Sequence, residues 1–212
     1  MTETINKAVR EIKWGGFTIG GENDFCVTKP LFALELNIFN FEASHPIVKE
    51  FYGNLSPNEL IKKAQKTNCD ILDLKFNISE DTVKQDIKKA KQLLKELLPK
   101  ITKPLLIQGI NNKNVDNLLL PELMSVLDRE CIIAFAEENT YKEIVPSVIK
   151  GNHILVIRTP IDINLAKEMN ILTTDMGLSP NRILIDTDMG GLGYGLEYGY
   201  SVMERIKLAA FA

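Results

Sequence analysis

The residues best suited to chemistry lie near the end of the chain, where carboxylates precede a glycine-rich segment. Asp186 and Asp188 follow the apolar run Ile183–Ile185, and glycines stand at positions 190, 191, 193 and 195. Glycine lets the backbone turn tightly and approach a ligand closely. Carboxylates at the carboxyl end of a parallel strand point to the place where α/β proteins bind ligands. We therefore predict a ligand-facing loop here, followed by a helix that begins near Leu196.

The glycine-rich segment matches neither common nucleotide-binding motif. Gly190 and Gly195 have the separation of the Walker glycines, but Leu196 and Glu197 stand where that motif has Lys and Ser or Thr. A dinucleotide-binding fingerprint would need a glycine in place of Leu196, and it would follow the first strand rather than the last. A sharp structural turn without a ligand is the alternative interpretation.

Six short apolar runs alternate with helical patterns and must position these residues. The runs are Leu31–Leu36, Ile71–Leu74, Leu105–Gln108, Ile132–Ala136, Ile154–Ile157 and Ile183–Ile185. Each has the length of a strand that is buried on both faces. Alternating strands and helices imply a parallel sheet with right-handed crossovers, either a doubly wound open sheet or a (β/α) barrel.

Local signals mark several helix starts and one hairpin. Ser56 and Glu59 form a capping box, Thr140 and Glu143 form a second, and Asp162 can cap a third helix. Before the first predicted strand, the glycine-rich segment 14–25 is typical of a short hairpin, which could plug the bottom of a barrel.

Composition indicates a soluble globular protein of one domain over residues 1–212. The 212 residues are 45% apolar and 25% charged, with a net charge of −3. The absence of a basic block argues against nucleic acid as a partner. No apolar run reaches the length of a membrane span, and residues 1–7 lack the apolar core of a secretion signal, so we expect a cytoplasmic protein. The scattered Cys26, Cys69 and Cys131 are expected to be reduced thiols.

Polar side chains follow every predicted strand, and a parallel sheet would bring them to one rim. They are Asn37, Lys75, Asn77, Gln108, Asn111, Asn112, Glu137, Glu138, Asn139, Thr159, Asp162, Asp186 and Asp188. Such a rim suits a large polar ligand with many hydrogen-bonding edges, such as the amide side chains of a corrin or a pterin ring. Loops are polar in any case, which explains most of these residues individually.

Four segments resemble the small (delta) subunit of the corrinoid/iron–sulfur protein in the acetyl-CoA decarbonylase/synthase system. They are Ile19–Phe25, Glu137–Glu143, Thr159–Arg182 and Gly193–Ala210. The resemblance implies a TIM barrel related to the pterin-dependent methyltransferases. It also implies a large partner subunit that carries the iron–sulfur cluster and a mobile cobalamin-binding domain. The corrinoid would lie between that domain and this chain, take a methyl group through a separate pterin methyltransferase, and deliver it to acetyl-CoA synthase.

The chain departs from the family in two respects. The family usually reads Met-Asp-Pro where this chain has Ile185, Asp186 and Thr187. A complete barrel has eight βα units and typically ~250 residues, whereas this chain offers about six units, so we expect a barrel that is incomplete at its C-terminus. The chain also lacks iron–sulfur cysteines and the Asp-x-His-x-x-Gly sequence of an axial cobalt ligand, because Ala43 stands two residues before His45.

The resemblance and the rim together give a set of predicted cofactor contacts. The nearest are Asp186, Thr187, Asp188, Gly190, Gly191 and Gly193, with Asn139, Thr159 and Asp162 as further candidates. No catalytic residue and no metal ligand is predicted. Two alternatives stay open. A stand-alone methyltransferase would bind a methyl-pterin through carboxylates such as Asp73 and Asp186. A non-catalytic scaffold barrel would contact only a partner subunit.

Overall fold

The computed structural model describes residues 11–20, 29–42 and 44–211, which fall into two compact units. One unit is Leu31–Val156, and the other combines Met1–Pro30 with Ile157–Ala212. The prediction of one domain over residues 1–212 stays a prediction.

Six strands form one sheet in chain order. They are β3 (Ala33–Phe39), β4 (Ile71–Phe76), β5 (Leu105–Gln108), β6 (Ile132–Ala136), β7 (Ile154–Arg158) and β8 (Ile183–Asp186). The pairs β3/β4, β4/β5 and β5/β6 are parallel. All six predicted strands are therefore confirmed, and four of them extend further at the carboxyl end than the apolar runs indicated.

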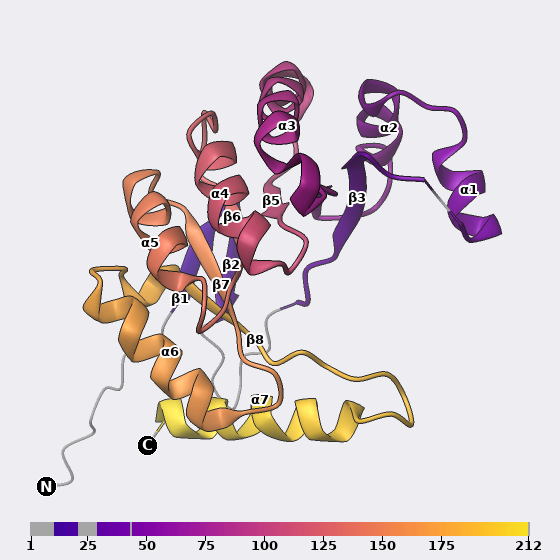
Figure 1. Cartoon of the computed structure of the whole chain (residues 1–212). Helices are drawn as coiled ribbons and strands as arrows, with labels where there is room; N and C mark the ends of the chain where they lie inside the picture. The colour runs from indigo at the N-terminus through magenta and orange to yellow at the C-terminus, as the bar shows by residue number, and fades with distance from the viewer. Residues whose placement is uncertain (1–10, 21–28, 43, 212) are drawn as a thin grey trace, which may run out of the picture. The chain divides into compact units, whose positions relative to one another are not determined.

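Helices follow the strands. The unit Leu31–Val156 contains α1 (Pro46–Tyr52), α2 (Pro57–Ala64), α3 (Val83–Leu97), α4 (Lys113–Met124) and α5 (Tyr141–Lys150), and the other unit contains α6 (Ile163–Asp175) and α7 (Leu196–Phe211). Short 3₁₀ turns lie at Glu80–Thr82, Leu98–Lys100 and Pro180–Arg182. Figure 1 shows α2, α3, α4 and α5 side by side along the strands of their unit. Strands in chain order with intervening helices form the wall of a TIM-type barrel.

Strand β4 shows how this arrangement buries apolar surface. Leu72, Leu74 and Phe76 alternate along the strand and have no exposed area. Successive strand residues point to opposite faces, so Asp73 and Lys75 lie on the other face of β4. Each fully buried Leu or Phe side chain contributes about 1.5–3 kcal/mol relative to exposure.

The capping predictions have mixed outcomes. The Ser56–Glu59 box is confirmed, since the Ser56 N–H donates to Glu59 Oε2 at 2.9 Å and the Glu59 N–H donates to Ser56 Oγ at 3.4 Å. Asp162 caps α6 as predicted. The predicted Thr140 box is wrong, because Thr140 Oγ1 instead accepts the Glu137 N–H at 2.8 Å and makes no side-chain cap for α5. The hydroxyl is used by the turn that precedes the helix.

The predicted hairpin is also confirmed over its described residues. Strands β1 (Glu11–Trp14) and β2 (Phe17–Gly20) pair in antiparallel fashion. Gly15 and Gly16 connect them with φ angles of 57° and 83°, the left-handed conformation of a two-residue hairpin turn. The rest of the predicted segment, residues 21–25, lies outside the described residues, and the role of the hairpin as a plug stays a prediction.

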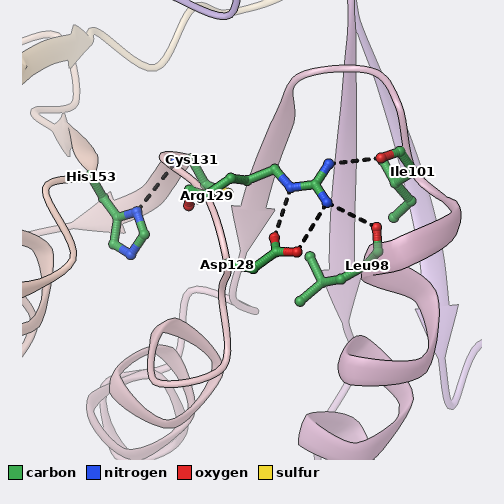
Figure 2. A network of polar contacts seen from close by, with 6 residues as sticks. All are labelled: Leu98, Ile101, Asp128, Arg129, Cys131 and His153. Carbon is green, nitrogen blue, oxygen red and sulfur yellow. Dashed lines mark hydrogen bonds and ion pairs between the residues drawn. The ribbon is translucent and has the colours of Figure 1, made fainter.

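A polar network holds the segments that lead into β6 and β7 (Figure 2). The Arg129 guanidinium pairs with Asp128 and donates to the Ile101 and Leu98 carbonyls at 2.7 and 3.0 Å. The buried His153 ring accepts the Cys131 N–H at Nδ1, at 3.2 Å, while its Nε2 has no partner. Burial lowers the pKa of His153 below its usual value of 6.5. His153 is therefore a structural residue at the amino ends of these strands.

His153 should make stability depend on pH. Its depressed pKa in the folded state means that the unfolded chain binds the proton more readily, so this stabilisation is full above pH 6.5 and falls as the pH drops below it. Chemical denaturation from pH 7.5 to 5 should show a steeper loss in the wild type than in His153→Gln. One proton changes the free energy of unfolding by at most ~1.4 kcal/mol per pH unit. Lys150→Gln, an exposed charge change on α5, should keep the wild-type slope, and equal slopes in all three proteins would contradict this role.

Candidate functional site

Hydrogen bonds hold the segment after β7 beside the segment after β8. The Thr159 N–H donates to the Asp186 carbonyl at 2.8 Å, and the Ile161 N–H donates to the Thr187 carbonyl at 3.0 Å. Thr159 Oγ1 also donates to the Asp186 carbonyl at 3.4 Å. This pairing fixes the backbone from which the predicted site residues project.

Two carboxylates share one arginine at this position. Asp188 Oδ1 lies 2.8 Å from Arg158 Nη2, and Asp186 Oδ2 lies 3.9 Å from Arg158 Nε. Asp186 Oδ1 also accepts the Asp188 N–H at 2.8 Å, which closes a tight turn around Thr187. These three side chains carry a net charge of about −1 and are partly exposed.

The glycine loop, residues 190–195, has a backbone that only glycine suits at several points. A side chain at Gly190 would place its Cβ 2.5 Å from the Tyr194 carbonyl oxygen, and Gly193 and Gly195 have φ angles of 77° and 104°. The Tyr194 N–H donates to the Gly191 carbonyl at 2.9 Å. The loop presents Tyr194 with 90% of its surface exposed, beside an exposed Leu192. The loop therefore exposes two large side chains to solvent.

The Thr187 hydroxyl lies at the start of this region without a partner. Thr187 is 3% exposed, and its buried Oγ1 makes no hydrogen bond with any residue that the structure describes. Buried polar atoms are almost always paired, so an unpaired one requires a reason.

The structure brings most of the predicted site residues together in one unit. Thr159, Asp162, Asp186, Thr187, Asp188 and the loop glycines all belong to the unit that includes Ile157–Ala212. Asp162 is engaged as the α6 cap, accepting the Asn164 and Leu165 N–H groups at 2.8 and 3.1 Å. Asn139 belongs to the other unit and is exposed in the turn before α5.

Sequence reasoning missed Arg158. It is the last residue of β7 and the cation that both carboxylates face. A lone arginine that ends an otherwise apolar strand was the available signal. Its partners lie at the end of β8 and in the segment that follows, nearly thirty positions away in the sequence, so spacing along the chain could not identify them.

Within the other unit, several polar residues after the strands organise their own loops. The buried Asp116 carboxylate, also missed from sequence, accepts the Ile110 N–H at 3.0 Å and the Asn112 N–H at 3.1 Å. Asn112 in turn caps α4 by accepting the Asn114 N–H. Asn37 accepts from Asn77 at 2.9 Å, and its own N–H donates to the Tyr52 hydroxyl. The polar side chains of these residues are therefore engaged in hydrogen bonds within their own unit.

Asp73 differs, because its carboxyl is buried and incompletely bonded. It is 8% exposed, and its Oδ1 has no hydrogen-bond partner. Burial, with the neighbouring Glu35 charge, raises the pKa of Asp73 to about 7, against the opposing effect of Lys75. The carboxyl can therefore exchange its proton near neutral pH.

The described histidines, cysteines and helices bear on two other possibilities, a metal site and a membrane span. His45 caps α1 through its Nδ1, which accepts the Ile47 N–H at 3.3 Å. Cys69 and Cys131 are free thiols, and Cys26 lies outside the described residues. In the described ranges 11–20, 29–42 and 44–211, no three His, Cys, Asp or Glu side chains gather as metal ligands. Over the same part of the chain, every helix is too short or too polar to cross a membrane.

Comparison with known structures defines the class of protein. Dihydropteroate synthase from Xanthomonas albilineans, solved with indole-2-carboxylic acid and 6-chloroguanine, superimposes with a TM-score of 0.59. The match covers 93% of this chain and 71% of that one at 10% identity, so it concerns the fold alone. The fold is thus α/β of the TIM-barrel type, as predicted.

Comparison of sequences then gives the family. Residues 33–212 match the family model CdhD, the CO dehydrogenase/acetyl-CoA synthase delta subunit. Subunit delta 1 of the acetyl-CoA decarbonylase/synthase complex of Methanosarcina thermophila is 35% identical over 77% of this chain, and subunit delta of Methanocaldococcus jannaschii is 30% identical over 76%. The chain belongs to the CdhD family. It spans about two fifths of these relatives, 39% and 41% of their lengths.

An alanine at position 191 of the glycine loop should be tolerated, whereas an alanine at position 190 should destabilise the chain. Gly190→Ala would force Cβ against the Tyr194 carbonyl, whereas a Cβ at Gly191 meets no atom within 4 Å. We expect Gly190→Ala to lower the free energy of unfolding by about 1–3 kcal/mol, as overpacking does, and Gly191→Ala to change it by less than about 0.5 kcal/mol. Urea denaturation of the two variants measures the difference. Equal stabilities would show that the loop does not hold this conformation.

Proposed function

We propose that this chain helps to hold a corrinoid for methyl transfer, as a subunit of an acetyl-CoA decarbonylase/synthase complex. The family match over residues 33–212 carries the proposal, and the relatives are named as delta subunits of that complex. Its main partner would be a large subunit that carries an iron–sulfur cluster and a cobalamin domain. A pterin methyltransferase and acetyl-CoA synthase would bind transiently, as methyl donor and acceptor.

The residues at the carboxyl ends of β7 and β8 fit such a group. The edge of a corrin carries amide side chains, which need both donors and acceptors. Asp186 and Asp188 offer carboxylate oxygens, Arg158 offers N–H donors, and Thr187 has an unused hydroxyl. The exposed Leu192 and Tyr194 add apolar surface for a large flat ligand. These features support Asp186, Thr187, Asp188, Gly190, Gly191 and Gly193 as the nearest contacts, with Thr159, Asp162 and Asn139 beyond them.

The chain would contribute binding and shape. When bound, the corrinoid would supply a cobalt centre that accepts and passes on a methyl group. The carboxylates and Arg158 would orient the ligand through charge-assisted hydrogen bonds. Tyr194 and Leu192 would exclude water from the ligand face that they cover.

Binding can be tested by combining the chain with its large corrinoid subunit at low micromolar concentration. We expect co-elution and a change in the corrinoid absorption spectrum. Gly193→Ala should weaken this binding about tenfold, because a side chain at a φ of 77° strains the loop.

Gly53→Ala is the matched control, with a φ of 53° and equally open space around its Cβ, at the end of α1. It should bind like the wild type. No co-elution and no spectral change with the unaltered chain would refute the proposal. Co-elution that persists without corrinoid, and without any spectral change on its addition, would favour a scaffold.

Asp73 favours a second candidate function, a pterin-binding methyltransferase. An aminopyrimidinone ring presents adjacent N–H groups that a carboxylate accepts, and Asp73 has a buried oxygen without a partner. The dihydropteroate synthase that shares the fold was solved with 6-chloroguanine, which carries a related aminopyrimidine edge.

Calorimetry with methyltetrahydrofolate and the chain alone tests this second function. Micromolar binding should strengthen as the pH rises through about 7, because the ionised carboxylate of Asp73 accepts both N–H groups. Asp73→Leu should abolish binding, while Asp81→Asn, at an exposed position, should preserve it. Absence of heat from the wild type would eliminate this candidate.

A further inference from the structure

A cavity lies beside the carboxyl end of β3, where the chain continues into α1 and α2. Its volume of about 470 Å³ is within the range of pockets that hold small molecules. The residues that line it come from β3, from the segment that follows, and from α1, α2 and their connection. They all belong to the unit Leu31–Val156, so one compact unit forms the whole cavity.

Apolar and aromatic side chains form much of the lining. Ile38 and Leu60 are almost fully buried, whereas Phe41 and Leu55 keep 39% and 38% of their surface exposed and are accessible to a ligand. The rings of Phe41 and Tyr52 pack together with their centroids 4.9 Å apart. This part of the cavity therefore suits an apolar or aromatic group.

Helix α1 brings two hydrogen-bond donors to the same cavity. The Tyr52 hydroxyl oxygen accepts the Asn37 N–H at 2.7 Å, which fixes its position against β3. The hydrogen of this hydroxyl has no acceptor among the residues that the structure describes. Lys49 stands three residues earlier in α1, so its ammonium lies on the same face of the helix and also lines the cavity. Two donors on one helix face suit the two oxygens of a carboxylate.

Glu42 adds a carboxylate to the lining. Within the described part of the chain, neither Glu42 nor Lys49 forms an ion pair with the other or with a third side chain. A simple anion in this cavity would meet the charge of Glu42, and a simple cation would meet that of Lys49. A ligand that carries both charges can pair with each of them.

We propose that this cavity binds a zwitterionic α-amino acid with a large apolar side chain. The carboxylate of the amino acid accepts hydrogen bonds from the Lys49 ammonium and the Tyr52 hydroxyl. Its ammonium pairs with Glu42, and its side chain lies against Phe41 and Leu55. None of the residues that line the cavity is among the proposed corrinoid contacts, so each proposal can fail without the other.

NMR titration of the ¹⁵N-labelled chain measures both the affinity and the location of binding. The probe is L-phenylalanine, for which we expect a dissociation constant of about 0.1–1 mM. The amide signals of Asn37, Gly53 and Asn54, which line the cavity, should shift. An absence of shifts, or shifts confined to residues away from the cavity, would overturn the proposal.

Three analogues test each part of the proposed ligand. 3-Phenylpropanoate lacks the ammonium, L-phenylalaninamide lacks the carboxylate, and L-alanine lacks the large side chain. Each should bind about three- to tenfold more weakly than L-phenylalanine, because each loses one set of contacts. Equal binding of all four compounds would show that the cavity does not recognise an amino acid.

Variants at the two charged positions separate specific pairing from general attraction. Glu42→Gln should weaken binding of L-phenylalanine about three- to tenfold and remove its preference over 3-phenylpropanoate. Lys49→Gln should weaken it similarly and remove the preference over L-phenylalaninamide. Both side chains are exposed, so the fold should be retained.

Glu50→Gln is the matched control, since Glu50 is an exposed carboxylate on α1 that does not line the cavity. It should bind L-phenylalanine like the wild type. Wild-type affinity in both Glu42→Gln and Lys49→Gln would contradict the proposal, as would an equal loss in Glu50→Gln.

Discussion

The candidate site depends on backbone hydrogen bonding that continues past the ends of β7 and β8. The bonds from Thr159 and Ile161 to the carbonyls of Asp186 and Thr187 join the segment after β7 to the last residue of β8 and to the residue that follows it. Because these bonds fix the backbone, the side chains of the site start from defined positions. Loops placed by a rigid parallel sheet are where α/β proteins concentrate their binding residues. The glycine loop follows directly in the chain, and the bond from the Tyr194 N–H to the Gly191 carbonyl fixes the backbone of that loop as well.

Within the part of the chain that the structure describes, buried polar atoms without a hydrogen-bond partner occur at different places along the strands. His153 Nε2 lies near the amino ends of β6 and β7, where the buried ring is part of a packed polar network that serves the fold. Thr187 Oγ1 lies at the carboxyl end of β8, and Asp73 Oδ1 lies on the face of β4 that is not packed with leucine. The same cost of an unmade hydrogen bond applies to all three.

The sequence predicted helix caps correctly where the hydrogen-bonding partners are neighbours along the chain. The Ser56 capping box and the Asp162 cap formed as predicted, because their partners lie within three residues along the chain. Thr140 failed for an equally local reason, since the Glu137 N–H competes for the same hydroxyl. Helix α4, which contains Pro121, was not identified in advance. Its fully buried Val115, Leu119 and Leu123 provide packing that the proline does not disturb.

The sequence by itself determined the six strands, their parallel class, the hairpin and the family, because apolar periodicity, turn glycines and shared segments are written along the chain. It also identified the carboxylates and glycines after the last strand. Only the tertiary structure decided that Arg158 faces both aspartates, that Thr187 is buried with its hydroxyl unpaired, and that the pKa of Asp73 is raised. The reason is physical: these properties depend on charge, burial and hydrogen bonding between different strands, and such contacts leave no trace in the spacing of residues within one strand.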